Sequence, residues 1–172
     1  MLHNIKIRNE TNLDYAQKIN ILDDCFGPFR LNRTVYMYRN SLPIKELSLI
    51  SCLKENQSKV IGTINFYRVL IDKTDCLLLG PLAVDKKFQG KGFGKILIKT
   101  GLEKAKKNSE KICFVSGEYS YYKEFGFDKI VNKKLNISLP GALSYDGLLI
   151  CELEDNSAKL LQSNSKLLPL KN

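Results

Sequence analysis

A glycine-rich stretch in the middle of the chain is the part of the sequence best suited to chemistry. Residues 78–98 read Leu-Leu-Gly-Pro-Leu-Ala-Val-Asp-Lys-Lys-Phe-Gln-Gly-Lys-Gly-Phe-Gly-Lys-Ile-Leu-Ile, the pattern of a buried strand, a turn and the start of a helix. Three glycines, Gly90, Gly92 and Gly94, fall within five positions. Glycine permits positive φ and close approach of a ligand, and the first turn of a helix leaves N–H groups without intrahelical partners. The stretch therefore predicts an anion site that suits phosphate or pyrophosphate.

Two other glycine-rich phosphate loops do not fit these residues. A Walker loop has the pattern G-x-x-x-x-G-K-[ST], whereas Gly90 and Gly94 enclose only three residues. Ile96 follows Lys95, so the hydroxyl that would bind Mg²⁺ is not there. The dinucleotide fingerprint Gly-x-Gly-x-x-Gly follows an early strand, but here the spacing differs and several predicted strands come first. The alternative without a ligand is a purely structural strand-to-helix turn.

The elements around this stretch follow from hydrophobic periodicity and turn residues. These patterns predict a first strand, a helix that ends at a Gly-Pro pair, a second helical segment and a meander of strands before the glycine turn. After the helix that follows the turn, they predict another strand and then a short helix. The expected order is strand 2–8, helix 11–27, helix 31–40, strands 46–54, 59–71 and 76–84, the helix after the glycine turn, strand 111–116, helix 117–127, and a last pair of strands, 135–139 and 148–153, around Pro140-Gly141.

The pair Gly80-Pro81 interrupts the strand that leads into the glycine turn. Proline supplies no N–H to a sheet and is rare inside central strands. We therefore expect a local break or bulge at this pair. It would leave the backbone of Leu82, Ala83 and Val84 available to pair with something other than a strand.

Length and composition favour a single soluble domain. With 172 residues, 44% hydrophobic and 26% charged, the chain is long enough to bury a sizeable core. We expect one domain over residues 1–154, followed by a polar tail or loosely packed helix over 155–172. No apolar run approaches the roughly 20 residues that span a bilayer, and residues 1–10 lack the apolar core of a signal peptide. These features predict a cytoplasmic protein with no membrane partner.

The cysteines and the histidine argue against several kinds of site. Five cysteines, odd in number and far apart, lie mostly among apolar residues: Cys25, Cys52, Cys76, Cys113 and Cys151. This pattern is typical of reduced thiols in the core. There is no Cys-x-x-Cys and His3 is the single histidine, so we expect no metal site and no Ser-His-Asp chemistry.

The net charge of +9 is concentrated near the glycine-rich stretch. From Lys86 to Lys111 there are nine lysines against Glu103 and Glu110, a net of +7. A positive field of this kind attracts a strongly anionic ligand. A basic helix face also suits a nucleic-acid backbone, so nucleic acid is not the expected partner but stays open. A solvated lysine face is an equally good interpretation of Lys99, Lys104, Lys106 and Lys107.

Two motifs together resemble the GNAT superfamily of acyl-CoA N-acyltransferases. Gln89 to Gly94 matches Gln/Arg-x-x-Gly-x-Gly/Ala, the pyrophosphate turn of that family, and Tyr122 to Phe127 matches its Tyr-x-x-x-Gly-Phe. The sequence Leu-Gly-Pro-Leu-Ala-Val-Asp, followed later by Tyr-Tyr-x-x-Phe-Gly-Phe, is similar to sequences of the YhbS-like branch of N-acetyltransferases. The resemblance covers nearly the whole chain. It implies an α/β GNAT fold, a mixed, mostly antiparallel twisted sheet of about 6–7 strands flanked by about 4 helices.

In this family the main chain of the strand and the turn binds the acyl donor, which implies a set of cofactor-binding residues. The backbone of Leu82, Ala83 and Val84 would pair with the pantetheine arm of acetyl-CoA, and the N–H groups of the turn would hold the pyrophosphate. The turn residues are Gln89, Gly90, Lys91, Gly92, Phe93, Gly94 and Lys95. Acetyl-CoA is therefore the implied cosubstrate, with no metal.

The resemblance also implies catalytic roles for Tyr122 and Glu118. Tyr122 matches the family tyrosine whose hydroxyl lies near the thioester sulfur. With a reference pKa of about 10 it could protonate the departing thiolate, whose own reference pKa is about 8.5. Glu118, beside the end of strand 111–116, could act as a base through a water, although the asparagine common there in the family is not evident. The alternatives are a packing role for Tyr122 and a solvated or capping role for Glu118, and Tyr119 and Tyr121 are expected to be structural.

The implied reaction is direct transfer of the acetyl group of acetyl-CoA to a primary amine. A small molecule, a protein N-terminus, a lysine or an aminoacyl group could be the acceptor. The second helical segment and Phe66-Tyr67-Arg68 are expected to border its pocket. The alternative function is a noncatalytic acyl-CoA-binding or nucleic-acid-associated regulatory module on the same fold. Both a monomer and a homodimer are compatible with the sequence.

Overall fold

The structure, a computed structural model, describes residues 4–32, 34–39, 41–138 and 147–169. The chain divides into two units, each assembled from three stretches of sequence. Unit 1 comprises Met1–Asn32, Pro43–Phe66 and Gly80–Lys104, and unit 2 comprises Arg33–Leu42, Tyr67–Leu79 and Ala105–Asn172. Three long elements contribute residues to both units: β3 (Val60–Ile71), β4 (Thr74–Val84) and α2 (Phe93–Lys107).

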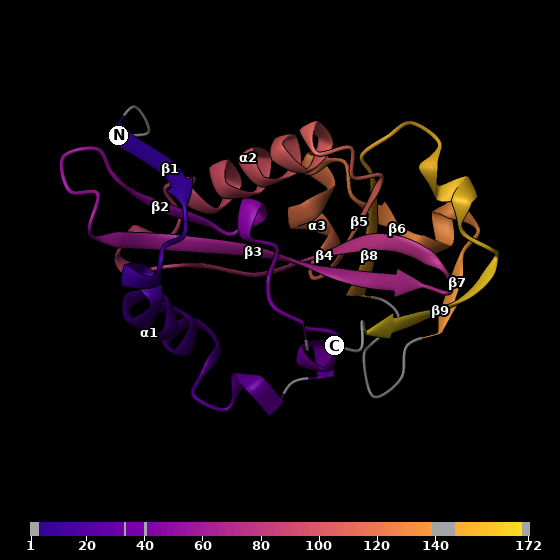
Figure 1. The fold of residues 1–172 in the computed structure, drawn as a ribbon, viewed down its shortest axis with the longest axis horizontal. Coiled ribbons are helices and arrows are strands. Elements are labelled where there is room, and N and C mark those ends of the chain that lie inside the picture. The colour runs from indigo at the N-terminus through magenta and orange to yellow at the C-terminus, as the bar shows by residue number, and fades with distance from the viewer. Residues whose placement is uncertain (1–3, 33, 40, 139–146, 170–172) are drawn as a thin grey trace. The chain divides into compact units, whose positions relative to one another are not determined.

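Unit 1 is a sheet with one helix on each face. β1 (Ile5–Asn9) pairs antiparallel with β2 (Leu49–Leu53), which pairs antiparallel with β3. α2 packs so closely on one face of β3 that a Cβ atom at Gly101 would lie 2.7 Å from Cε2 of Phe66. Ile50, which pairs with Thr63 on the other face, belongs to the buried cluster of α1 (Tyr15–Phe26). The helices α1 and α2 therefore lie on opposite sides of β3, as Figure 1 shows.

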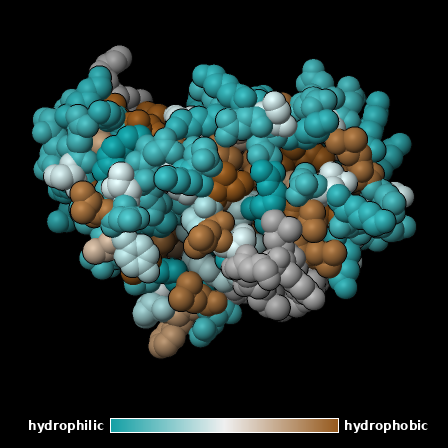
Figure 2. Space-filling model, in the orientation of Figure 1, coloured by the Kyte–Doolittle hydropathy of each residue, from teal (hydrophilic) through white to brown (hydrophobic). Residues whose placement is uncertain are grey.

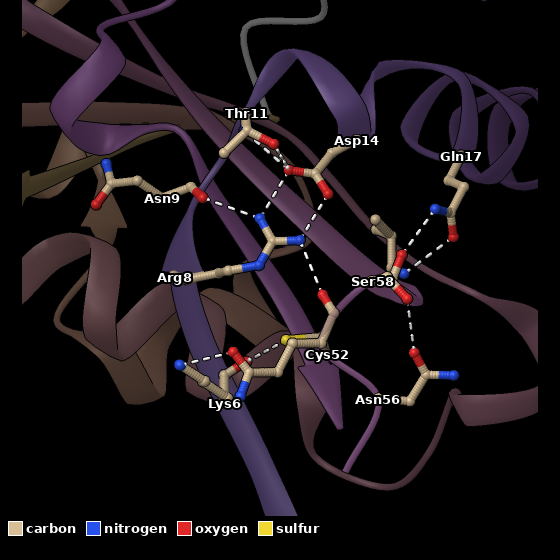
Figure 3. A network of polar contacts seen from close by, with 11 residues as sticks. Lys6, Arg8, Asn9, Thr11, Asp14, Gln17, Cys52, Asn56 and Ser58 are labelled. Atoms are coloured by element: carbon tan, nitrogen blue, oxygen red, sulfur yellow. Dashed lines mark hydrogen bonds and ion pairs between the residues drawn. The ribbon is translucent and has the colours of Figure 1, made fainter. Parts of the chain in front are cut away.

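A partly buried ion pair connects β1 to the start of α1 (Figure 3). Nη2 of Arg8 lies 2.6 Å from Oδ1 of Asp14, and Nη1 lies 2.7 Å from Oδ2. The backbone N–H and the hydroxyl of Thr11 also donate to Asp14 Oδ2, each at 2.8 Å. The hydrogen bonds from Arg8 lower the pKa of Asp14 to about 2, against the effect of burial, and the bonds from Thr11 add to the lowering. Thr11 and Asp14 thus form a capping box immediately before the helix.

Unit 2 contains the remaining strands and a separate core. The end of β4 in this unit, Leu77–Leu79, pairs in parallel with β5 (Ile112–Ser116). β8 (Leu148–Glu152) pairs antiparallel with β5 and with β6 (Asp128–Lys129). β9 (Asn164–Pro169) pairs antiparallel with β3 and in parallel with β7 (Asn136–Ser138). The described pairings are thus mixed and mostly antiparallel, and the predicted fold class is confirmed. The described residues form nine strands and three α-helices, rather than the expected 6–7 strands and about 4 helices.

The C-terminal segment differs from the expectation of a polar tail or loosely packed helix over 155–172. Its described part contains a 3₁₀ turn, η10 (Ser157–Leu160), and the strand β9. Ser165 and Leu167 are buried while Lys166 between them is exposed, which is the period of a half-buried strand. The expectation was wrong because this strand finds its partners far away in the sequence, on β3 and β7.

Three smaller expectations also need correction. The predicted helix over 31–40 is two 3₁₀ helices, η3 (Arg30–Asn32) and η4 (Thr34–Tyr38), in a stretch whose β-branched and aromatic residues favour the α-helix weakly. β4 runs without a break through Gly80-Pro81, whose peptide bond is cis. The predicted strands β7 and β8 are present but pair with other strands rather than with each other, and the Pro140-Gly141 loop lies outside the described residues.

Figure 2 shows one face on which hydrophobic residues appear in small separate groups among polar ones. Scattered exposed apolar residues of this kind are normal for a folded domain. All five cysteines are free thiols, four of them buried and Cys25 partly buried. Within the described ranges, no helix has the length and apolar character needed to cross a membrane.

Candidate functional site

The connection between β4 and α2 has the backbone that its glycines predict. The carboxylate of Asp85 accepts a hydrogen bond from the backbone N–H of Lys87 at 2.9 Å and caps the 3₁₀ helix η6 (Lys86–Phe88). Gly90 and Gly92 then adopt φ of 74° and 85°, in the left-handed region that favours glycine. A Cβ atom at Gly90 would meet nothing within 4 Å, so backbone conformation rather than crowding explains this glycine. Gly94 is already part of α2.

The start of α2 presents backbone donors beside this turn. The N–H of Ile96 donates to the carbonyl of Gly92 at 3.1 Å, which begins the hydrogen-bond ladder of the helix. The N–H groups of Phe93 and Gly94 come before this bond and have no acceptor within the helix. These donors and the positive end of the helix dipole suit a phosphate group.

Two side chains bind the carbonyl oxygen at the end of β4. Nε2 of Gln89 donates to the oxygen of Val84 at 2.9 Å, and Sγ of Cys25 donates to the same oxygen at 3.3 Å. The side chain of Gln89 therefore holds the turn against β4, and only its main chain remains for the predicted role in anion binding. Of the predicted pantetheine-binding residues, Ala83 is buried, and Leu82 and Val84 are partly buried.

The lysines of the turn have defined positions. The ammonium of Lys91 donates to the carbonyl of Lys87 at 2.8 Å and lies 5.3 Å from the centre of the Phe88 ring. The ammonium of Lys59 lies 5.6 Å from the same ring. Along α2, Lys104 donates to Oδ1 of Asn9 at 2.8 Å, and further lysines, Lys95, Lys99, Lys106 and Lys107, have exposed side chains. The turn is therefore positively charged, and a hydrogen bond and a ring contact hold the ammonium of Lys91 in place.

Tyr122 lies at the end of α3 (Tyr119–Tyr122), and aromatic rings fix its orientation. Its ring meets those of Tyr121 and Phe127 edge to face, with centroid distances of 5.1 Å and 5.6 Å. Burial raises the pKa of Tyr122, Tyr121 acts in the same direction, and the positive charge of Arg39 opposes both. The phenol hydroxyl therefore keeps its proton throughout the neutral pH range, as a proton donor must.

Glu118 occupies the N-cap position of α3. Its carbonyl accepts hydrogen bonds from the N–H groups of Tyr121 and Tyr122, both at 3.1 Å. Its carboxylate is exposed and makes no capping hydrogen bond. The structure therefore gathers Tyr122 and Glu118 in unit 2 and the predicted cofactor-binding residues in unit 1.

One residue whose positive charge acts on Tyr122 was not predicted from the sequence. Cζ of Arg39 lies 4.8 Å from the ring centre of Tyr36 and 5.9 Å from that of Tyr67. The second helical segment and the strand around Tyr67 were expected to border an acceptor pocket, but nothing in the spacing marked Arg39. An arginine that packs against two aromatic rings can be recognised only once the chain is folded.

Comparisons with known proteins agree with this geometry. A sequence model described as "Acetyltransferase (GNAT) family" matches residues 17–127. Two proteins of Escherichia coli strain K12 are similar in sequence. The uncharacterized N-acetyltransferase YjhQ is 34% identical over 89 residues, which are 49% of this chain and 49% of YjhQ. The uncharacterized N-acetyltransferase YhbS is 29% identical over 92 residues, 52% of this chain and 55% of YhbS. The matched stretch thus spans about half the length of each relative.

Solved structures share the fold. The crystal structure of E. coli YhbS in complex with CoA has a TM-score of 0.79 at 23% identity and covers 95% of this chain and 89% of that one. A GNAT family acetyltransferase from Brucella melitensis in complex with acetyl-CoA has a TM-score of 0.70 at 23% identity, with 98% and 97% covered. The family expected from the two motifs is confirmed. The match over residues 17–127 and the shared fold show that this chain belongs to the acetyltransferase (GNAT) family.

Proposed function

We propose that this protein is an N-acetyltransferase that transfers the acetyl group of acetyl-CoA directly to a primary amine. The observation that carries the proposal is the turn between β4 and α2, where two left-handed glycines precede a helix start rich in lysine. Membership of the GNAT family supports the same activity. The complexes of two related folds with CoA and acetyl-CoA support the identity of the donor.

In the proposed complex, main-chain groups hold the donor. The N–H groups of Gln89, Gly90, Lys91, Gly92, Phe93, Gly94 and Lys95 would bind the pyrophosphate. The backbone of Leu82, Ala83 and Val84 would pair with the pantetheine arm, with the Val84 carbonyl already engaged by Gln89 and Cys25. The positive charge of Lys91, held by the Lys87 carbonyl, would add electrostatic attraction without needing to reorganise.

In the proposed chemistry, a neutral amine attacks the thioester carbonyl. A C–N bond forms, the C–S bond breaks, and the amine loses a proton. Glu118 would accept this proton through a water. Tyr122, which burial keeps protonated, would donate its proton to the departing thiolate. Placing the two substrates next to each other supplies much of the remaining rate enhancement.

The test is a screen of the purified full-length chain for amine-dependent thiol release from acetyl-CoA. The panel should contain small amines, peptides with free N-termini and lysine peptides, and mass spectrometry should identify the acetylated product. We expect release above the rate of hydrolysis with at least one amine. Binding of acetyl-CoA by calorimetry without turnover on any amine would overturn the enzymatic proposal. If that result came with tight, salt-dependent RNA binding, it would favour the noncatalytic regulatory module instead.

The place of action and the partners belong to the same proposal. We expect the protein to work in the cytoplasm on an amine-bearing acceptor. Analytical ultracentrifugation would decide between a monomer and a homodimer.

A further inference from the structure

Arg39 is a partly buried cation whose described neighbours are aromatic rather than acidic. Its guanidinium lies against the rings of Tyr36 and Tyr67, with Cζ to centroid distances of 4.8 Å and 5.9 Å. Its Nε atom is buried and has no hydrogen-bond partner among the residues that the structure describes. Ser41, two residues further along, has a buried hydroxyl oxygen that also lacks a partner there. A buried donor left unsatisfied costs free energy, so a native protein rarely keeps one without a use.

The other arginines in the described part of the chain are paired with carboxylates, as partly buried arginines usually are. Each has a carboxylate partner within 2.7 Å: Arg8 with Asp14, Arg30 with Asp23, and Arg68 with Glu110. In the described part of the chain, the titratable groups that act on Arg39 are instead three tyrosines, Tyr36, Tyr67 and Tyr122. Burial lowers the pKa of Arg39, but from so high a reference that the group stays charged at neutral pH.

The position of Arg39 connects it to the predicted catalytic tyrosine. Arg39 and Tyr122 belong to the same unit, and the charge of Arg39 acts to lower the pKa of the Tyr122 phenol. A negative group bound at Arg39 would therefore lie in the same unit as the hydroxyl that we propose to protonate the thiolate. That is where an acceptor, rather than the pyrophosphate of the donor, is needed.

We propose that Arg39 binds an oxyanion of the acceptor, so that the acceptor is an amine that also carries a carboxylate or a phosphate. This inference rests on the proposed acetyl transfer. A guanidinium offers paired N–H donors in a plane that matches a carboxylate or a phosphate. The flanking tyrosine rings hold that plane in place through cation–π contact and reduce the entropy lost on binding. The acceptor charge then supplies the acidic partner that Arg39 does not have among the residues that the structure describes.

The test compares amines that differ only in the anionic group. L-amino acids are paired with the corresponding L-amino acid amides, and 2-aminoethyl phosphate is paired with 2-aminoethanol. For at least one pair, we expect wild-type kcat/KM to be higher for the anionic member by about tenfold to a hundredfold, as for a hydrogen bond to a charged group. The pair that shows the preference tells whether the anion is a carboxylate or a phosphate.

Variants assign the preference to Arg39. Arg39→Gln should reduce the ratio of the two kcat/KM values to near one, and Arg39→Lys, which keeps the charge but not the planar fork, should retain part of it. Arg30→Gln is the matched control because it removes the same charge, but from a guanidinium that the carboxylate of Asp23 already occupies. That control should leave the ratio unchanged, whatever it does to stability.

Three results would overturn the inference: no anionic preference in the wild type, an unchanged ratio in Arg39→Gln, or an equal loss of the ratio in Arg30→Gln. If Arg39→Gln does not fold, the ratio measured for Arg39→Lys decides, because an unchanged ratio there excludes recognition by a planar fork. If no amine releases thiol although acetyl-CoA binds, the proposed function fails separately. Calorimetry with N-acetyl-amino acids and their amides then tests the anion site directly, since equal binding by wild type and Arg39→Gln rejects it.

Discussion

The ring of Tyr122 packs directly on the α-carbon of Gly117. A Cβ atom at residue 117 would lie 2.5 Å from Cε2 of Tyr122 and 3.1 Å from Cδ2, far inside the sum of the atomic radii. The rings of Tyr121 and Phe127 meet the Tyr122 ring edge to face. Together with Gly117 they form the surface on which the phenol packs, called here the seat of Tyr122. The glycine immediately after β5 thus sets where the proposed proton donor points.

Gly117→Ala is expected to displace the Tyr122 ring and lower kcat by about tenfold to a hundredfold, because small misplacements of a reacting group are costly. Affinity for acetyl-CoA, measured by calorimetry, should change little. Gly147→Ala is the matched control, since a Cβ there would lie 3.8 Å from the nearest atom, Oγ of Ser116. If the Gly117→Ala variant were as active as this control, packing of Tyr122 on Gly117 would not be needed for catalysis.

Tyr122→Phe removes the hydroxyl and keeps the ring. We expect kcat to fall by about a hundredfold or more, the range for loss of a general acid, with acetyl-CoA affinity nearly unchanged. Tyr119→Phe serves as the control, because the contact of that ring with Lys129 survives the change. Full activity in Tyr122→Phe would remove this residue from the mechanism.

The pH profile of the wild type should also report on Tyr122. Burial raises the pKa of this phenol above its usual value near 10, so its neutral form persists further into the alkaline range. We therefore expect no loss of kcat from phenol ionisation below about pH 10. A descending limb near neutral pH that disappears in Tyr122→Phe would contradict this assignment.

Gly92→Ala should weaken acetyl-CoA binding by about tenfold or more, because the left-handed turn would relax away from the anion. The substitution should also cost about 1–3 kcal/mol of folding free energy from backbone strain. Gly27 has the same φ of 85° at the end of α1, so Gly27→Ala controls for the strain. Gly94→Val tests close approach alone, since Gly94 lies within α2, outside the left-handed region. Retained binding in both Gly92→Ala and Gly94→Val would defeat the assignment of the site.

Asp14→Asn should destabilise the fold at neutral pH by roughly 2 kcal/mol, the free energy that corresponds to the lowered pKa of Asp14. A lowered pKa means that the stabilisation is complete above the unfolded-state value near 3.8 and is lost as the pH falls through about 2. Urea denaturation of wild type and Asp14→Asn at pH 7 and at pH 2.5 should show the difference shrink. Asp24→Asn, at an exposed position on the same helix, should have no comparable effect at either pH.

Local sequence patterns predicted those elements whose structure is determined by their own residues. The glycines at 90 and 92 indicated positive φ, and the structure has it at both. The apolar runs of β3, β4 and β5 were recognisable because these strands are buried along most of their length. The family motif then assigned the predicted catalytic role to Tyr122. Spacing alone would not have distinguished this residue from its neighbours Tyr119 and Tyr121.

Features that depend on distant partners could not be predicted in the same way. The strand β9 looks polar by itself and becomes a strand by pairing with Val69–Ile71. Arg39 meets Tyr67 only because a 3₁₀ segment and β3 converge in the folded unit. The seat that Gly117 provides depends on the ring direction of a residue five positions later. Each of these is a property of packing rather than of a sequence window.

The thiol of Cys25 also provides a site for attaching a fluorescent label next to the glycine turn. Three of the remaining cysteines are disfavoured as thiolates, since burial raises the pKa of Cys76 to about 12, of Cys151 to about 11 and of Cys113 well above its usual value, and the fourth, Cys52, is fully enclosed. An environment-sensitive fluorophore should therefore attach selectively at Cys25 in the unmodified protein. Because that sulfur touches the last carbonyl of β4, the emission of the dye would record donor occupancy in real time, even for variants that have lost all turnover.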